Sequence, residues 1–314
     1  RDNEEIFHLA DGTVLHRKET GDPSHASMFM HNLNLNYSVQ DPEKYLFNAT
    51  FRYWNNHQPH WDYRGILSNQ DNPDDYVDMV DLNSSDNQVP ALDLYYQRNL
   101  KNDQTLVFNV VGTYNRTSSH RFYQESRGEE LLTDINNRVS GKKYSLIGEA
   151  IYEKKLANGN SLSGGVWHTQ SFSDNEYRNG HDYETHMDQS ASSIYGEFKG
   201  KVRKLDYMLG VELARLYYKQ EGTDDSDQFY TFNPRFTLQY ALPGQSFIRL
   251  KGYVGNLSPS LGNLNAVEQV IDSLQLQRGN PRLESYMSYL LDLNYEYQKG
   301  IFYALVNGTY EYVP

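Results

Sequence analysis

Strict alternation of apolar and polar residues is the dominant pattern of this chain, and it is most regular in residues 276–312. Apolar residues occupy every second position over 289–297, a turn follows at 298–300, and the alternation resumes over 302–312. A period of two places the apolar side chains on one face of a β-strand. This stretch therefore predicts two neighbouring antiparallel strands, each with one apolar face.

The same pattern recurs in pairs along the chain, so we expect about a dozen strands. Short turns join the two members of each pair, whereas the pairs themselves are separated by long segments that carry no alternation and are predicted to be loops. The predicted pairs are 28–39 with 45–53, 92–99 with 106–114, 144–153 with 162–169, 194–198 with 207–213, and 236–242 with 248–254. The predicted loops are 1–22, 55–90, 118–140, 173–188, the segment containing Asp224, Asp225 and Asp227, and 256–285.

The length of the apolar faces and the order of short and long connections indicate a membrane barrel. A tilted membrane strand needs roughly 9–11 residues, and tyrosines lie near the strand ends, where an aromatic ring meets both lipid and water. No run approaches the 18 apolar residues of a helical span. Short turns on one rim and long loops on the other are typical of bacterial outer-membrane barrels. We therefore predict an all-β, antiparallel transmembrane barrel in the bacterial outer membrane, with membrane lipid around it.

Composition narrows the chemistry further. The net charge of -12 argues against nucleic-acid binding. There is no Cys, and no nucleophile, phosphate-loop or zinc motif occurs, so we predict no enzyme, no cofactor and no metal. His57 and His60 flank Pro59 in what is taken for a polar loop. Residues 81–86 loosely resemble a calcium loop but lack its central Gly and its late Glu.

Motifs in the last third of the chain resemble a known family. Residues 256–260 read Asn-Leu-Ser-Pro-Ser and are followed by Leu264; residues 279–284 read Gly-Asn-Pro-Arg-Leu-Glu; residues 232–235, Phe-Asn-Pro-Arg, open a predicted strand. This set resembles the late barrel of TonB-dependent receptors, most closely the Bacteroidetes type. The resemblance implies a parent protein with an N-terminal plug, about twice as many strands and a TonB-type energising partner. Residues 1–314 are then expected to be one barrel segment without plug or remaining strands.

Two groups of residues are candidates for ligand binding. Aromatic and polar side chains cluster in the predicted loop 55–90 and next to it, which suits stacking on sugars or ring-containing ligands; they also suit an aromatic girdle or loop packing. Charged residues at positions opposite the apolar faces would line the lumen. The candidates are Trp54, His57, Trp61, Tyr63, Arg235, Arg249 and Lys251, and further lumen positions are Asn109, Glu149, Glu212 and Asp292.

The function that follows from the resemblance is uptake of a ligand too large or too scarce for diffusion, such as a glycan, a ferric chelate, a peptide or a vitamin. A surface lipoprotein is a further expected partner. Two alternatives stay open at this point. One is a passive porin or adhesin barrel; the other is a soluble all-β carbohydrate-binding domain, in which Leu291, Leu293, Val211 and Leu238 would pack against a second sheet.

Overall fold

A single antiparallel sheet forms almost the whole molecule. The computed structural model describes residues 2–9, 11–69, 72–157, 159–178, 182–220, 226–257, 263, 267–280, 283 and 285–314, with only the backbone of residues 73, 226 and 227. Within these residues the sheet has 13 strands, in the order β1 to β11, β14, β15. The strands are β1 (Asp2–His8), β2 (Val14–Asp41), β3 (Tyr45–Asn69), β4 (Asn72–Leu100), β5 (Gln104–Arg127), β6 (Glu130–Lys155), β7 (Ser161–Arg178), β8 (Asp182–Val202), β9 (Leu205–Gln220), β10 (Ser226–Ala241), β11 (Phe247–Leu257), β14 (Tyr286–Lys299) and β15 (Phe302–Tyr312). A separate two-stranded hairpin consists of β12 (Gln269–Val270) and β13 (Leu276–Gln277).

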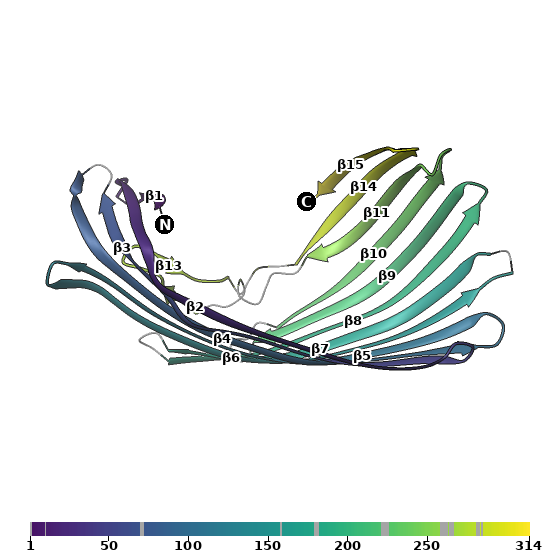
Figure 1. Cartoon of the computed structure of the whole chain (residues 1–314), viewed down its shortest axis with the longest axis horizontal. Coiled ribbons are helices and arrows are strands. Elements are labelled where there is room, and N and C mark those ends of the chain that lie inside the picture. Colours follow the sequence, from purple (N-terminus) through teal and green to yellow (C-terminus); the bar gives the residue numbers. More distant parts are fainter. Residues whose placement is uncertain are drawn as a thin grey trace.

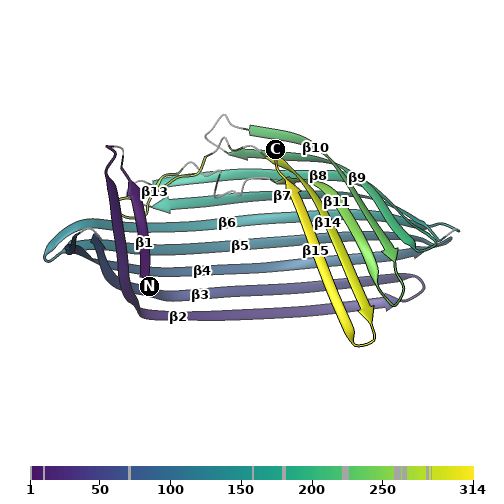
Figure 2. The same ribbon diagram turned by 90° about the horizontal axis from the view of Figure 1, so that it is seen from above.

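The sheet curves into an open trough, with β1 and β15 as its two edge strands (Figure 1). The hairpin β12–β13 lies on the concave side, and both views place it near β1 (Figure 2). No helix among the described residues is long and apolar enough to span a membrane. The predicted all-β antiparallel fold with about a dozen strands is confirmed.

The convex face carries the large apolar side chains. Side chains that contact the hairpin β12–β13 lie on the inner face of the sheet. Residues directly opposite each other on neighbouring strands share a face, so the register identifies the inner and outer positions of the other strands. The opposite, outward positions form a belt of exposed apolar residues. Examples from successive strands are Leu35, Phe51, Leu92, Val110, Leu146, Val166, Ile194, Val211, Phe232, Ile248, Leu293 and Val306.

The molecule lacks the compact interior of a soluble domain. Its accessible surface is 20116 Å², whereas a compact protein of 36.5 kDa would expose about 13,500 Å². Leu291, Leu293 and Val211 are 41%, 45% and 48% exposed, and no second sheet covers them in the described residues. Leaving this apolar area in water would cost about 25 cal/mol per Å². Hydrocarbon around the belt removes that cost.

Short turns lie on one rim of the sheet, as predicted. Strands β4 and β5 meet across residues 101–103, β6 and β7 across 156–160, and β14 and β15 across 300–301. Gly300 has a φ of 60°, in the left-handed region that glycine adopts without strain. This rim corresponds to the periplasmic side of bacterial barrels, which have short periplasmic turns.

Three of the predicted long loops are wrong. Residues 55–90, 118–140 and 173–188 are mostly strand, because β3 to β8 continue past the apolar belt and form tall hairpins on the opposite rim. Beyond the belt both faces of these strands carry polar residues, so the alternation disappears although the backbone ladder persists. We name these parts of β2 to β8 the extensions.

Other predictions also need correction. Residues 1–22 were expected to be loop, but β1 pairs there with the start of β2. The motif 232–235 lies inside β10 instead of opening it; Pro234 has no N–H, and the described β10–β11 ladder begins at Arg235. Of the other motif positions, residues 258–260, 264, 281, 282 and 284 lie outside the described residues, as do Asp224, Asp225 and the side chain of Asp227.

Candidate functional site

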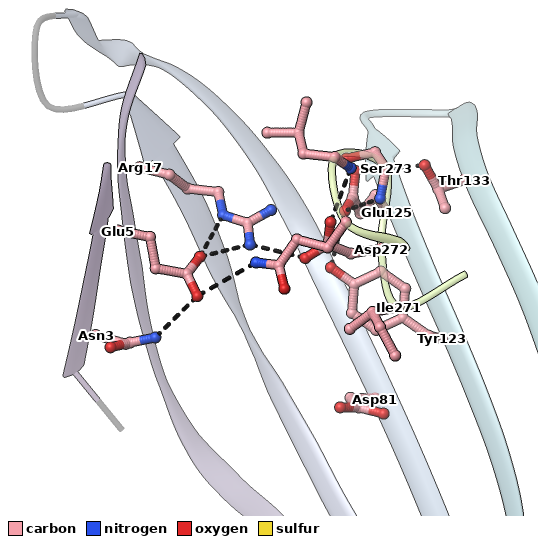
Figure 3. A network of polar contacts seen from close by, with 12 residues as sticks. Asn3, Glu5, Arg17, Asp81, Tyr123, Glu125, Thr133, Ile271, Asp272 and Ser273 are labelled. Atoms are coloured by element: carbon pink, nitrogen blue, oxygen red, sulfur yellow. Dashed lines mark hydrogen bonds and ion pairs between the residues drawn. The ribbon is translucent and has the colours of Figure 1, made fainter. Parts of the chain in front are cut away.

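The most distinctive feature of the concave face is the segment between β11 and β14, which folds inward. Its hairpin is closed by the amide of Ile271 donating to the carbonyl of Gln275 at 2.9 Å. The amide of Leu274 donates to the side chain of Asp272 at 2.8 Å, which fixes the turn. This hairpin lies against the wall formed by β1, β2, β5 and β6 (Figure 3).

A buried ion pair attaches the hairpin to β2. Arg17 donates to Asp272 Oδ2 at 2.7 Å and to Glu5 Oε2 from Nε at 2.9 Å. The side chains of Arg17 and Asp272 are only 9% and 8% exposed. Burial lowers the pKa of Arg17, but the hydrogen bonds to Asp272 and Glu5 outweigh it and raise the pKa above its ordinary value. The guanidinium is therefore a permanent, desolvated cation at the turn of the hairpin.

Two further side chains of the wall hold the hairpin backbone. Arg121 donates to the carbonyl of Ile271 at 2.6 Å, and Asn137 donates to the carbonyl of Val270 at 3.1 Å. Arg121 is itself oriented by a two-point contact with Asp81, at 2.9 and 3.1 Å. Bidentate guanidinium–carboxylate pairs are geometrically strict. The wall thus presents fixed donors that match the carbonyls of the hairpin.

Below these contacts the inner side of the extensions has a small apolar core. Tyr63, Leu67, Met79, Tyr123 and Ile135 are buried together. The hydroxyl of Tyr123 donates to Glu125 Oε1 at 2.8 Å, and Glu125 also accepts from the amide of Ser273 at 3.5 Å (Figure 3). Burial, and then the hydrogen bond to Glu125, raise the pKa of Tyr123 above its ordinary value.

The inner wall within the belt carries a second polar array. Arg235 contacts Glu197 at 2.8 Å and lies over the ring of Tyr195, whose hydroxyl donates to Glu149 at 3.0 Å. Trp167 donates to Glu212 at 3.1 Å. Together with Lys251 and Asp292, which face each other across β11 and β14, part of this array lines a wall recess of about 730 Å³. It can offer both charges and an aromatic ring to a polar solute.

The predicted lumen residues lie on the same inner face as this array. Arg235 and Lys251 line the wall recess, and Arg249 lies on the same inner face with its guanidinium 5.2 Å from the ring of Phe247. Asn109, Glu149, Glu212 and Asp292 also have inward register. The sequence parity placed all of these side chains on the correct face.

The predicted binding residues on β3 are not brought together. Trp54 and Trp61 have inward register, Tyr63 belongs to the buried core, and His57 faces outward opposite Asp86. Asp81, at the start of the calcium-like stretch, lies within β4 and pairs with Arg121. Strand β3 therefore carries no single pocket that joins the four candidates.

The hairpin anchors were not found from the sequence. Arg17 lies in a segment predicted to be loop, and Asp272 lies in one of the long connections. Only the three-dimensional fold, with the hairpin on the concave side of the curved sheet, brings residues 255 positions apart into contact. No periodic or motif signal marks either residue.

Comparisons with known proteins agree with this geometry. Residues 167–312 match the outer membrane protein beta-barrel family. The chain is similar to the copper transporter OprC, with 11% identity over 96% of this chain and 55% of that one and a TM-score of 0.55. It is also similar to BauA, the ferric preacinetobactin receptor from Acinetobacter baumannii (8% identity, 94% and 54% coverage, TM-score 0.54). The ferripyoverdine receptor of the outer membrane of Pseudomonas aeruginosa gives 11% identity, 94% and 46% coverage and a TM-score of 0.53.

The chain spans about half the length of these solved structures. No curated protein matches the chain. The shared fold, the family match and the apolar belt confirm the predicted resemblance to TonB-dependent receptor barrels and exclude the soluble all-β alternative. The chain is a β-barrel protein of the bacterial outer membrane, with the fold of the TonB-dependent receptor barrels.

Proposed function

We propose that this chain is the barrel segment of a TonB-dependent-receptor-like transporter that carries a ligand across the outer membrane. The observation that supports the proposal is the anchored hairpin β12–β13. It lies on the concave side of the sheet and is bound to the wall formed by β2, β5 and β6. A barrel of this width would otherwise leave its lumen open to any small solute.

The contacts of the hairpin suit a gate with a fixed position. Arg17, Arg121 and Asn137 bind it from three strands, and the ion pair with Asp272 is buried. Breaking a buried pair leaves an unpaired charge and is costly. Such a segment narrows the entrance selectively instead of moving freely. Solutes that pass it meet the polar array of Arg235, Glu197 and Tyr195.

The remaining parts of the mechanism belong to the proposal as well. An N-terminal plug would close the lumen, a TonB-type complex would supply energy through that plug, and a surface lipoprotein would deliver ligand to the extensions. No catalytic step is assigned. The solved structures of similar fold are a copper transporter, a ferric preacinetobactin receptor and a ferripyoverdine receptor. This keeps metal chelates among the candidate ligands beside glycans, peptides and vitamins.

Transport by the full-length protein in cells distinguishes this proposal from a passive barrel. A strain lacking the gene should lose growth on one class of nutrient supplied at limiting concentration, tested with ferric chelates, cobalamin, peptides and glycans. Collapsing the proton-motive force should stop uptake of that nutrient at once. Uptake that continues as simple diffusion would contradict the proposal.

Conductance provides a test that needs no ligand. The purified full-length protein in a planar bilayer should show little steady conductance, because hairpin and plug close the lumen. A large, ohmic channel in every insertion would favour the passive porin and exclude the gated transporter.

A further inference from the structure

Two histidines and one aspartate converge on the outer face of the extensions of β2 and β3. His25 lies on β2, and His60 and Asp62 lie on β3. Asp62 is directly opposite His25 in the register, and His60 is opposite Ser27. The intervening Trp61 and the next residue, Tyr63, have inward register. The three candidate ligands therefore share the outward face, beyond the apolar belt.

The geometry points to a site for a borderline divalent metal ion, of the zinc or copper class, held by His25, His60 and Asp62. One ligand atom from each residue lies within 4.8 Å of the others. The Nδ1 atoms of His25 and His60 are 3.9 and 3.8 Å from the same oxygen, Oδ2 of Asp62. Two imidazoles and one carboxylate form a common set of protein ligands for zinc with one open position.

The distances are close to those of a bound state. With Zn–N and Zn–O bonds of 2.0–2.2 Å, ligand atoms of a tetrahedral site lie about 3.3 Å apart. The two imidazole–carboxylate separations of 3.9 and 3.8 Å would have to contract by about 0.5 Å. The remaining separation, which is within 4.8 Å, would have to contract by up to about 1.5 Å. The two rings, now stacked with centroids 4.2 Å apart, would have to tilt until their lone pairs converge. The imidazoles are 57% and 49% exposed, so this movement meets little resistance.

The backbone is irregular at this point in both strands. The β2–β3 register shifts between Pro23 and His25 and between Ser27 and Phe29, and on the β3–β4 side between Gln58 and Trp61. β-Bulges re-aim side chains and often accompany functional sites. Pro23 and Pro59 lie at two of these shifts, where a missing N–H interrupts the ladder least. The register shifts, together with Pro23 and Pro59, therefore set the direction in which His25 and His60 point.

Charge also favours a cation. The side chain of Asp62 is only 18% exposed, and the ion pairs found for it among the described residues are those with the two imidazoles. The next opposite pair on this face, Asp22 and Arg64, is balanced in charge. A largely covered carboxylate beside two imidazoles would be stabilised by a metal ion. His57, which is close to His60 in the sequence, faces Asp86 at 3.9 Å and is not part of the cluster.

Zinc binding to the full-length protein in detergent, stripped of metal by a chelator, tests this inference. The probe is Zn²⁺ alone, measured by calorimetry, with Ca²⁺ and Mg²⁺ as ions that prefer oxygen ligands. Loss of a residue that merely orients a ligand costs roughly 10–100-fold in metal affinity. We therefore expect H60A and D62N to lose one zinc site or at least about tenfold in its affinity.

His57→Ala is the matched control, since His57 lies on the same strand and the same face and also has a carboxylate nearby. The zinc affinity of this variant should be within about twofold of that of the unchanged protein, because His57 supplies no ligand. Cobalt in place of zinc should give visible absorption bands that H60A lacks. Heat-modifiable migration on gels confirms that each variant is folded. Equal zinc binding by H60A and the unchanged protein, or an equal loss in H57A, would overturn the inference.

Discussion

The apolar belt and the extensions are built from the same strands, yet different forces hold them together. In the belt, side chains alternate between lipid and lumen, and Phe108, Val110 and Tyr114 on β5 all face outward. Four and six residues beyond Tyr114, on the same strand and the same face, Ser118 and His120 stand in place of apolar residues. The backbone ladder continues without change.

The comparison shows that a strand needs an apolar face only where it meets an apolar environment. In the belt, the surrounding lipid requires apolar side chains and every backbone group must be paired within the sheet. In the extensions, cross-strand hydrogen bonds, ion pairs and the small core around Tyr63 and Tyr123 suffice. The same fold is thus specified by side-chain pattern in one half and by pairing in the other.

The largest expected effect is the difference in stability between two variants of β5, one with an arginine in the belt and one with an arginine in the extension. Val110 is outward, 42% exposed and central in the belt portion of β5. Val110→Arg should destabilise the barrel by about 2–4 kcal/mol, the cost of Arg facing lipid near the midplane. Urea unfolding of the protein in lipid vesicles, followed by heat-modifiable migration, measures this change.

Ser118→Arg is the matched control on the same strand and face, beyond the belt. It should change the free energy of unfolding by less than about 0.5 kcal/mol, as surface substitutions usually do. If the two variants are equally destabilised, lipid does not surround the belt as assigned here.

Removing the buried cation of the extensions should have the next largest effect. Arg17→Met leaves Asp272 and Glu5 without their partner. Because Glu5 keeps 29% of its side chain exposed, we expect a cost on the order of 2 kcal/mol, below the 3–5 kcal/mol of a fully buried pair. Hydrogen exchange of residues 267–280 should then accelerate roughly thirtyfold, while exchange in the belt stays unchanged.

Arg127→Ala separates burial from mere proximity of charges. Arg127 and Asp75 are also 2.7 Å apart in the extensions, but their side chains are 57% and 47% exposed. Exposed pairs contribute about 0–1 kcal/mol, so exchange of the hairpin should stay within severalfold of the unchanged protein. If hydrogen exchange of the hairpin accelerated as much as in Arg17→Met, the hairpin would be held by the overall electrostatic field of the wall and not by the buried ion pair.

Almost all strands of the belt could be predicted from the sequence, because apolar and polar residues alternate in them. Residues 144–153 with 162–169, for example, were paired correctly, as were their turn and the inward position of Glu149. The extensions were predicted to be loops, since hydrophobic periodicity cannot report a strand whose faces mix polar and apolar residues without a regular period. Residues 55–69 form a strand through their pairing with β2 and β4, which is not visible in a single segment.

The residues of the candidate site also fall into two groups, those that could be predicted from strand alternation and those that could not. Arg235 and Lys251 were placed in the lumen by parity, because one face of their strands is apolar. Arg17 and Asp272, by contrast, come from segments without a pattern, and their contact depends on how far the sheet curves. Curvature is a property of the whole sheet, so such contacts require coordinates.

The smallest effect expected concerns the hydroxyl that supports the hairpin from below. Tyr123→Phe removes the donor to Glu125 but keeps the ring in the core. We expect the free energy that holds the hairpin against the wall to fall by about 1 kcal/mol, the net contribution of one hydrogen bond. Since this chain has no Cys, a spin label at Leu274→Cys, a position 43% exposed, reports the mobility of the hairpin directly.

The pH dependence of that label separates the hydroxyl from simple packing. The raised pKa of Tyr123 means that the anchored state favours the neutral phenol. Its contribution is therefore complete below the ordinary tyrosine pKa of about 10 and is lost as the pH rises above that value. In the unchanged protein the label should become more mobile above about pH 10, because an ionised phenol beside Glu125 and Asp272 is repelled. Tyr123→Phe should show no such rise, and an identical rise in both proteins would assign the alkaline loosening to another group of the wall.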